Sequence, residues 1–320
     1  MTFDDGASIV CSEDHYWKCK LKKSERFGKG RKNKWGVYSL QEIRKHGGDD
    51  PIPRERAVIP CAVCEMDPQE VPLDPYTLGV ILGDGGISQD SVNFTTEDEE
   101  IAEMVQSSVG TFAKVTKRAQ DPDTKARCYG VISPTPTCTN RPSPVKEALK
   151  QLGLMGLLSH QKFIPECYLE NGVEVRLQLL RGLMDTDGYA DKGGNTYFYS
   201  SSSRLAEGIC RLVRSLGGKA CVRWKETDIA TVRTKRRGRP LSRRHKVPRR
   251  KCLNMAIVWI DIPHFSPFGL ERKTSRWESR KRWPIHGRFL EKIEPFGNAE
   301  CCCIRVDSPD HTFVTQDYIV

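Results

Sequence analysis

The order of hydrophobic and polar residues indicates short strands at the start of the chain. Apolar and polar residues alternate from Phe3 to Cys19 around Asp4-Asp5-Gly6, which predicts a hairpin followed by another strand. A helix should start at Ser39, with Glu42 three residues later completing a capping box. We therefore expect a small mixed unit that is mainly β-structure.

Proline marks the end of this unit. Residues 51–53 and 68–75 are rich in proline and indicate a linker, so the first domain boundary is expected near Pro72. Alternation resumes after Pro284, where short strands are expected at 289–293, 301–306 and 313–320.

A repeat lies between residues 75 and 224. Each copy opens with an apolar helix that ends in Asp-Gly, over residues 77–85 and 180–188. Strand-like residues follow, and a cluster of hydroxyl side chains then caps an amphipathic helix. The clusters and their helices are Thr95-Thr96 with 101–109 and Ser200–Ser203 with 205–216. Thr96 and Glu99 should form a second capping box.

Small residues recur four positions apart on both Asp-Gly helices, which allows two helix backbones to approach closely. They are Gly79 and Gly83 in the first helix, and Gly182 and Thr186 in the second. Gly85 and Gly188 are expected in the left-handed conformation that ends a helix. Asp84 and Asp187 would then lie together at two C-terminal helix ends.

Two carboxylates at helix C-termini are unfavourable, because the helix dipole and the like charge both oppose ionisation. A divalent cation such as Mg²⁺ resolves this conflict and can promote phosphodiester hydrolysis. The alternative is that Asp-Gly merely ends a helix. Because the dipeptide recurs 103 residues later in the same helix-strand-helix order, at Asp84 and then Asp187, we favour the metal site.

These paired segments resemble the motifs of the LAGLIDADG, or dodecapeptide, homing endonucleases. The resemblance implies an α+β fold in which two pseudo-symmetric αββαββ halves form a saddle over DNA. It also implies that Asp84 and Asp187 are catalytic and bind Mg²⁺, with Mn²⁺ as a substitute. Asp185 occupies the motif's first Asp position, where the first copy has Leu82, and we assign it no catalytic role.

The resemblance further implies one basic catalytic residue in each half. Lys162 matches the family's Lys-x-x-Pro segment, and Lys273 is the equivalent in the second half. The alternative for either lysine is a solvated surface charge.

Charge points to a polyanionic partner. The net charge is +10, and residues 233–251 hold eleven Lys or Arg and no acidic residue. Within this basic loop the candidate DNA-binding residues are Arg233, Lys235, Arg236, Arg237, Arg239, Arg243 and Arg244. Arg237-Gly-Arg-Pro240 resembles an AT-hook core, against the alternative of a solvated loop. With neither an apolar run of about 20 residues nor a signal-peptide core, a soluble, cytoplasmic protein without membrane association is expected.

The thirteen cysteines are expected to be mostly free thiols, because this long chain lacks an export signal. Cys61 and Cys64 form a lone C-x-x-C with no second pair at zinc-site spacing. A structural role is therefore expected for these two cysteines rather than zinc binding.

Both termini resemble intein splicing segments of the Hint type. Residues 2–17 resemble block B, with His15 and Trp17, and residues 303–314 resemble block F, with Cys303 and His311. Trp17 together with Cys303 resembles the class in which an internal cysteine attacks the upstream junction, although a buried strand cysteine is the alternative. Block A and the terminal His-Asn are missing from this sequence, so we expect that the chain alone does not splice.

The predicted organisation is a splicing segment at 1–70, LAGLIDADG halves at 73–165 and 166–287, and a second splicing segment at 288–320. The predicted function is a Mg²⁺-dependent endonuclease that cuts a long asymmetric site in double-stranded DNA as a monomer, carried inside a host protein. The alternatives are a non-cleaving DNA-binding protein, an RNA maturase, and a splicing remnant with a degenerate nuclease.

Overall fold

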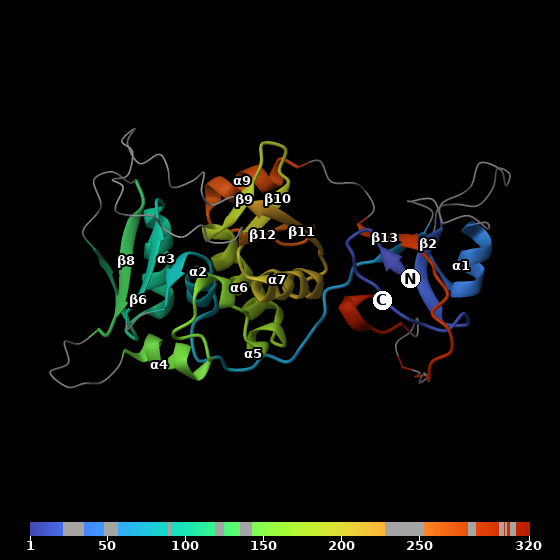
Figure 1. Ribbon diagram of the computed structural model, residues 1–320, viewed down its shortest axis with the longest axis horizontal. Coiled ribbons are helices and arrows are strands. Elements are labelled where there is room, and N and C mark those ends of the chain that lie inside the picture. The colour runs from blue at the N-terminus through green and yellow to red at the C-terminus, as the bar shows by residue number, and fades with distance from the viewer. Residues whose placement is uncertain are drawn as a thin grey trace, which may run out of the picture.

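The computed structural model describes residues 1–21, 35–47, 57–88, 91–118, 125–134, 143–227, 253–280, 286–300, 304, 306–307 and 312–320. Within these residues the strands form three sheets, one of five strands and two of four. Figure 1 shows the five-stranded sheet in a lobe that also holds both chain ends, with the two four-stranded sheets and their helices beside it. None of the described helices is both long and apolar enough to cross a membrane.

The five-stranded sheet, here called the terminal sheet, combines strands from both ends of the sequence. Its order is β1-β13-β4-β2-β3, so β13 lies between two N-terminal strands. The strands are β1 (Thr2–Phe3), β2 (Tyr16–Leu21), β3 (Trp35–Ser39), β4 (Ala57–Pro60) and β13 (Gly287–Lys292). The N-terminal and C-terminal segments therefore build one sheet together, and the residues between β4 and β13 are inserted into that unit.

Local signals at the start of the chain are confirmed. Gly6 has a φ of +78°, and the tight turn at residues 4–6 returns the chain so that Thr2 bridges Ser8. Helix α1 (Leu40–Gly47) follows Ser39, whose backbone N–H donates to Glu42 at 2.8 Å while its hydroxyl accepts from the Glu42 N–H at 3.1 Å. This is the reciprocal capping box expected from sequence.

The strands expected near the C-terminus are partly wrong. Residues 289–293 fall largely in β13, but residues 313–320 contain the 3₁₀ turn η2 (Gln316–Tyr318) instead of a strand. Asp317 and Tyr318 have φ values of +57° and +55°, which break the extended backbone that a strand requires. The described part of 301–306, Ile304 and Val306, has no strand conformation.

The middle of the chain folds as two αββαββ units. The first contains α2 (Pro75–Asp84), β5 (Gly85–Gly86), β6 (Val92–Thr96), α3 (Glu99–Val109), β7 (Lys114–Lys117) and β8 (Arg127–Ile132). The second contains α6 (Val173–Thr186), β9 (Gly188–Ala190), β10 (Thr196–Ser200), α7 (Ser203–Ser215), β11 (Lys219–Thr227) and β12 (Leu253–Asp261). The sheet orders β5-β6-β8-β7 and β9-β10-β12-β11 are equivalent. The predicted pseudo-symmetric halves are therefore confirmed.

Further short helices follow each unit. They are α4 (Pro144–Gln151), η1 (Ser159–Gln161) and α5 (Glu166–Leu169) after the first, and α9 (Glu271–Glu278) after the second. One continuous hydrophobic core joins both halves, with α2 and α6 packed together within it.

The capping box expected at Thr96 and Glu99 is wrong. Helix α3 begins at Glu99 with Asp98 at the N-cap, and the Thr96 hydroxyl accepts from the Asp98 N–H instead. Glu99 pairs with Lys117 and Arg127 at the ends of the neighbouring strands. Two cations therefore hold the carboxylate that the local sequence pattern assigned to the helix N-terminus.

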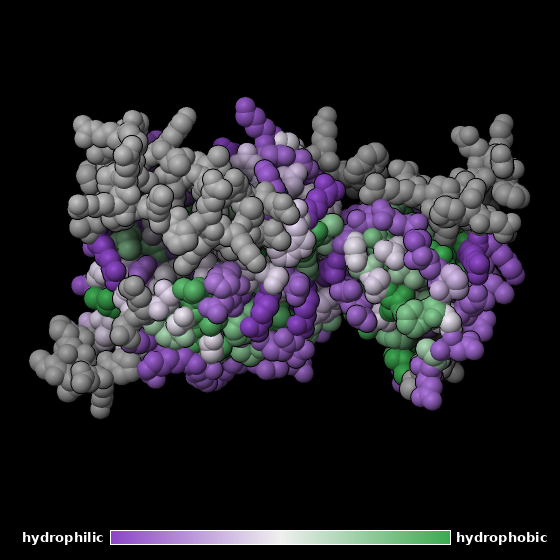
Figure 2. All heavy atoms as spheres, viewed as in Figure 1, coloured by the Kyte–Doolittle hydropathy of each residue, from purple (hydrophilic) through white to green (hydrophobic). Residues whose placement is uncertain are grey.

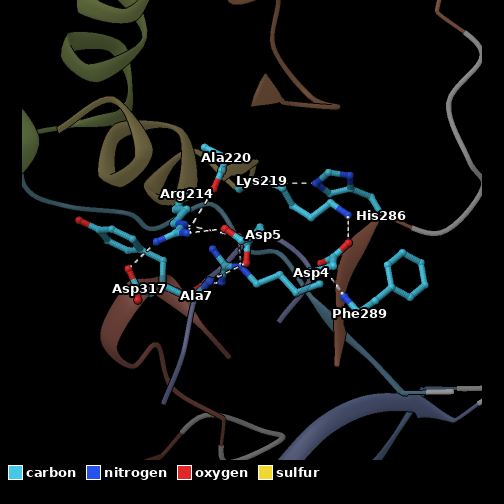
Figure 3. Close-up of polar contacts among 12 residues, drawn as sticks. Asp4, Asp5, Ala7, Arg214, Lys219, Ala220, His286, Phe289 and Asp317 are labelled. Carbon is cyan, nitrogen blue, oxygen red and sulfur yellow. Dashed lines mark hydrogen bonds and ion pairs between the residues drawn. The ribbon is translucent and has the colours of Figure 1, made fainter. Parts of the chain in front are cut away.

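The terminal sheet docks on the second half through buried charges (Figure 3). Asp5 and Arg288 are fully buried, and the Arg288 Nε donates to the Asp5 carboxylate at 2.9 Å. From the second half, Arg214 donates to the Asp5 carbonyl at 2.9 Å and to Asp317 at 2.7 Å, while Lys219 donates to Asp4 at 3.0 Å. The predicted turn at Asp4-Asp5-Gly6 therefore forms part of this interface.

Figure 2 shows a largely hydrophilic surface with apolar patches both on the lobe of the terminal sheet and along the lower part of the paired halves. Tyr16, Trp35 and Val37, on β2 and the edge strand β3, are 66%, 42% and 47% exposed.

Candidate functional site

Two carboxylates mark the centre of the paired halves. Asp84 is the last residue of α2, and Asp187 directly follows α6. These two helices cross closely because of glycine. A Cβ on Gly79 would lie 2.4 Å from the Leu179 carbonyl oxygen, and one on Gly182 would lie 2.2 Å from the Tyr76 carbonyl oxygen. The expected close approach of the two helices is therefore present in the structure.

Gly83 extends this close packing to the helix ends, since a Cβ there would lie 2.0 Å from the Thr186 hydroxyl oxygen. Gly85 and Gly188 were expected in the left-handed conformation, and this is wrong. Gly85 is extended, with a φ of −80°, and Gly188 does not have a positive φ either. Glycine is needed for space, since a Cβ would lie 2.2 Å from the Ile81 carbonyl oxygen or 2.3 Å from that of Met184.

The surroundings of the two carboxylates disfavour their charge. The pKa of Asp187 is raised to about 7, mainly by burial and then by the charge of Asp84, although Lys162 and Lys273 oppose the rise. Burial also raises the pKa of Asp84, again opposed by the two lysines. A cation placed between the carboxylates would offset this cost.

Lys162 and Lys273 occupy matching buried positions beneath the two carboxylates. The Lys162 Nζ donates to backbone carbonyls at the end of α2, at 2.9 Å from Ile81, 3.1 Å from Leu82 and Gly83, and 2.7 Å from Gly85. The Lys273 Nζ donates to the carbonyls of Met184, Asp185 and Gly188 at 2.9, 2.8 and 2.7 Å. Each lysine thereby satisfies carbonyls that a helix end leaves without partners.

The alternative of a solvated surface charge is wrong for both lysines, since Lys162 is 3% exposed and Lys273 6%. Burial lowers the pKa of each ammonium group to about 8, while the nearby aspartates oppose this change. The structure therefore assigns both lysines a capping role, and the catalytic role stays a prediction.

Asp185 breaks the symmetry between the halves. Its buried carboxylate accepts from the Tyr76 hydroxyl at 3.0 Å and from the backbone N–H groups of Gly269 and Leu270. Burial raises its pKa to about 6, and these hydrogen bonds oppose the rise. The matching position in the first half is Leu82, which is buried in the core.

A cleft of about 610 Å³ opens beside Asp84. Its lining also includes Thr95, Thr96, Glu97, Asp98, Ala126, Asp185, Thr186, Arg272 and Lys273. At its edge the Arg272 guanidinium holds the Asp98 carboxylate with two hydrogen bonds, one of 2.9 Å from Nε. Sequence reasoning missed this pair. The position of Arg272 directly before Lys273 could have indicated that Arg272 lies near the site, but not that it pairs with Asp98.

Asp84 and Asp187 are suited to bind a metal ion whose coordination is completed by water and substrate. Among the described residues no group of three His, Cys, Asp or Glu could hold an ion. Two carboxylates with raised pKa values fit a divalent cation whose remaining positions are filled by water and phosphate oxygens.

Other predicted site residues lie elsewhere or outside the described residues. His15 packs edge-on against Trp17, with ring centroids 4.9 Å apart, and burial lowers the pKa of His15. Cys303, His311 and the basic loop 233–251 are outside the described residues.

Cys61 and Cys64 make backbone contacts with distant segments, as their expected structural role requires. The backbone of Cys61 forms an antiparallel β-bridge with Ile319. The Cys64 N–H donates to the Ser215 carbonyl, and the Cys64 carbonyl accepts from the buried Arg176. Burial raises the pKa of the Cys61 thiol to about 11, which disfavours the thiolate that zinc requires. Eight described cysteines are free thiols, namely Cys11, Cys19, Cys61, Cys64, Cys128, Cys167, Cys210 and Cys221.

Residues 174–251 match the family model of the LAGLIDADG-like domain. Over 99% of its length the chain is 23% identical to a replicative DNA helicase DnaB of Mycobacterium intracellulare, of which the alignment covers 48%. It is 28% identical to a Nostoc replicative DNA helicase DnaB over 53% of the chain and 20% of the helicase. The chain thus spans about half, or less, of the length of the curated relatives that it matches.

Solved structures that resemble this chain include the homing endonuclease I-DmoI with DNA and Ca, at 13% identity and a TM-score of 0.38, covering 65% of this chain and 97% of that chain. A complex of the same endonuclease with DNA and Mn has 13% identity and a TM-score of 0.35, covering 59% and 89%.

Proposed function

We propose that this chain is a site-specific endonuclease that hydrolyses both strands of a DNA duplex with the help of Mg²⁺. The observation that carries the proposal is the pairing of Asp84 and Asp187 at two helix ends with raised carboxyl pKa values. The match of residues 174–251 to the LAGLIDADG-like domain supports it. A protein that only bound DNA would have no need of this costly pair of charges.

Asp84 and Asp187 would hold the cation, which supplies charge neutralisation and an activated water when bound. Lys162 and Lys273 hold the carbonyls at the two helix ends, so they keep both carboxylates in place. Arg272, at the edge of the cleft, stays paired with Asp98. Because one chain supplies both carboxylates, we propose that it acts as a monomer on an asymmetric target.

Cleavage of a plasmid library that carries candidate insertion sites tests this proposal. Wild-type protein with Mg²⁺ should produce double-strand breaks, and the double variant Asp84→Asn, Asp187→Asn should not. Glu174→Gln removes an exposed carboxylate from the opposite end of α6 and serves as the matched control. Replacing Mg²⁺ with Ca²⁺ should preserve binding and suppress cleavage. Breaks that persist in the double variant would contradict the proposal.

We also propose that the nuclease halves, residues 73–165 and 166–287, interrupt a Hint-type splicing domain formed by 1–70 and 288–320. Pairing of β13 between β1 and β4 supports this division. A protein named as a replicative DNA helicase aligns with 99% of this chain, which spans 48% of it, and this fits insertion into a longer host protein. We retain His15, Trp17, Cys303 and His311 as the splicing-type residues.

Mass spectrometry on cells that express the complete gene tests the intein context. A host peptide that spans a ligated junction without these 320 residues is expected. Finding only peptides that run from the host protein into this chain would refute it.

A further inference from the structure

The two four-stranded sheets differ in the chemistry of the face turned away from the helices. Residues directly opposite each other on antiparallel strands share one face. In the second half, Tyr189 opposes Tyr197, Tyr197 opposes Trp259, and Trp259 opposes Cys221. Their chain neighbours Phe198 and Val258 are buried on the other face, which α6 and α7 cover (Figure 1).

This open face is rich in apolar and aromatic groups. A second row crosses the sheet through Tyr199, Ile257 and Arg223. Tyr189 is 46% exposed and Tyr199 is 37% exposed. The Arg280 guanidinium lies 5.8 Å from the centroid of Trp259 and is paired with Asp261, whereas Arg223 in the second row is exposed. Arginine is well suited to contact the phosphates of a DNA duplex.

The equivalent face of the first half is polar. Asn93 opposes Gly130, which opposes Thr116, and the Thr116 hydroxyl donates to the Gly130 carbonyl at 3.3 Å. Thr95, which follows on the same face of β6, is exposed. The apolar exceptions among the described residues of this face are Cys128, opposite Thr95, and Ile132, opposite Lys114 at the end of β8.

Both faces begin at the carboxylate pair. Strand β5 starts directly after Asp84, and β9 starts directly after Asp187. A duplex placed on the carboxylates would therefore lie along both sheets, one half-site on each. In the major groove, apolar side chains recognise the thymine methyl group, whereas amides and hydroxyls hydrogen-bond to base edges.

We propose that the second half recognises its half-site through thymine methyl groups that pack on Tyr189, Tyr197, Tyr199 and Ile257. The first half reads the other half-site through hydrogen bonds. This inference rests on the proposed function, since it assumes a DNA duplex centred on Asp84 and Asp187. The occupant is DNA because the face continues from the carboxylate pair and because it carries the exposed Arg223 beside its apolar groups.

Replacement of thymidine by deoxyuridine, which lacks only the methyl group of the base, tests the inference. The full-length protein is bound in Ca²⁺ to the target duplex recovered by cleavage, with uridine placed in one half-site at a time. In the methyl-reading half-site, each methyl group lost is expected to weaken binding about fourfold. In the other half-site the change should stay below about twofold.

Variants assign the effect to the correct sheet. Tyr199→Ser should lower affinity for thymine-containing DNA and remove the penalty for uridine, whereas Thr95→Ala in the first half should leave that penalty unchanged. If Tyr199→Ser is unfolded by circular dichroism, Tyr189→Ser takes its place. Both tyrosines are exposed, so the fold does not depend on burying them.

The outcomes separate the two proposals. Absence of any target that is bound or cut overturns the proposed nuclease function and this inference with it. Specific binding and cleavage that tolerate uridine in both half-sites, or a uridine penalty that survives Tyr199→Ser, overturn the methyl-recognition proposal alone.

Discussion

Gly182→Ala should separate the two helices that carry the carboxylates. The added Cβ would lie 2.2 Å from the Tyr76 carbonyl oxygen and 3.0 Å from both the Gly79 Cα and the Val80 nitrogen. Carbon and oxygen atoms that are not bonded approach to about 3.3 Å, so the helices must move apart by about 1 Å. All three obstacles belong to the backbone, and no side-chain rotation relieves them.

Two energies oppose each other in this variant. Alanine favours a helix over glycine by about 1 kcal/mol. Overpacking a buried contact costs about 1 to 3 kcal/mol, and the rigid backbone here places the cost at the upper end. We expect a net loss of about 2 kcal/mol in the free energy of unfolding, and a displacement of Asp187 relative to Asp84 that slows cleavage about a hundredfold.

Urea denaturation and a plasmid cleavage assay measure the two effects. The matched control is Gly208→Ala in α7, where the new Cβ would meet the side chain of Ile164 at 3.3 Å, which can shift. This control should be nearly as stable and active as the wild type. Wild-type stability together with wild-type cleavage in Gly182→Ala would show that the helices do not need their close approach.

Three further predictions concern charged groups. Lys162→Met should lower the free energy of unfolding by about 2 kcal/mol, because it orphans carbonyls at the end of α2; an unchanged urea midpoint would contradict the capping role. Arg288→Met should lower the free energy of unfolding by about 3 kcal/mol, because it leaves the buried Asp5 carboxylate without its main partner. Lys292→Met, which removes an exposed charge, is the control, and an equal loss in both variants would refute this prediction. The folded-state pKa of Asp187 is raised from 3.8 to about 7, so the folded protein holds this proton more tightly than the unfolded chain does. Stability without metal should therefore fall as pH rises from about 4 to 7, and Asp187→Asn should flatten that part of a urea stability profile recorded in EDTA.

Local and periodic signals account for what sequence could predict. The turn at Asp4-Asp5-Gly6 and the capping box of Ser39 involve neighbours within a few positions, so the sequence contains the whole interaction. The repeated Asp-Gly helices indicated two copies of one helix-strand-helix unit, because a repeat reports the same fold twice. The αββαββ topology followed from the resemblance to the LAGLIDADG motifs. Steric reasoning about Gly79 and Gly182 also holds, since only a residue without a Cβ permits backbone contact.

Sequence reasoning failed where a competing partner was distant in the sequence. Glu99 matched a local capping pattern, but strand cations Lys117 and Arg127 hold it. Arg272 meets Asp98 across 174 positions, and no local pattern could pair them. Lys162 was recognised as a site residue, yet its burial under α2 depends on how the segment after the first sheet returns to that helix.

The sequence by itself determined the two Asp-Gly helices and their glycine contacts, because helical periodicity and the size of a side chain are local properties. Only the tertiary structure decided that Lys162 and Lys273 cap those helices and that Asp185 ties α6 to Gly269 and Leu270. It also decided that one half has a polar sheet face and the other an aromatic one. These features arise when segments far apart in the chain pack together. Burial and like charge then set the pKa of Asp187, and neither quantity exists before the two helices meet.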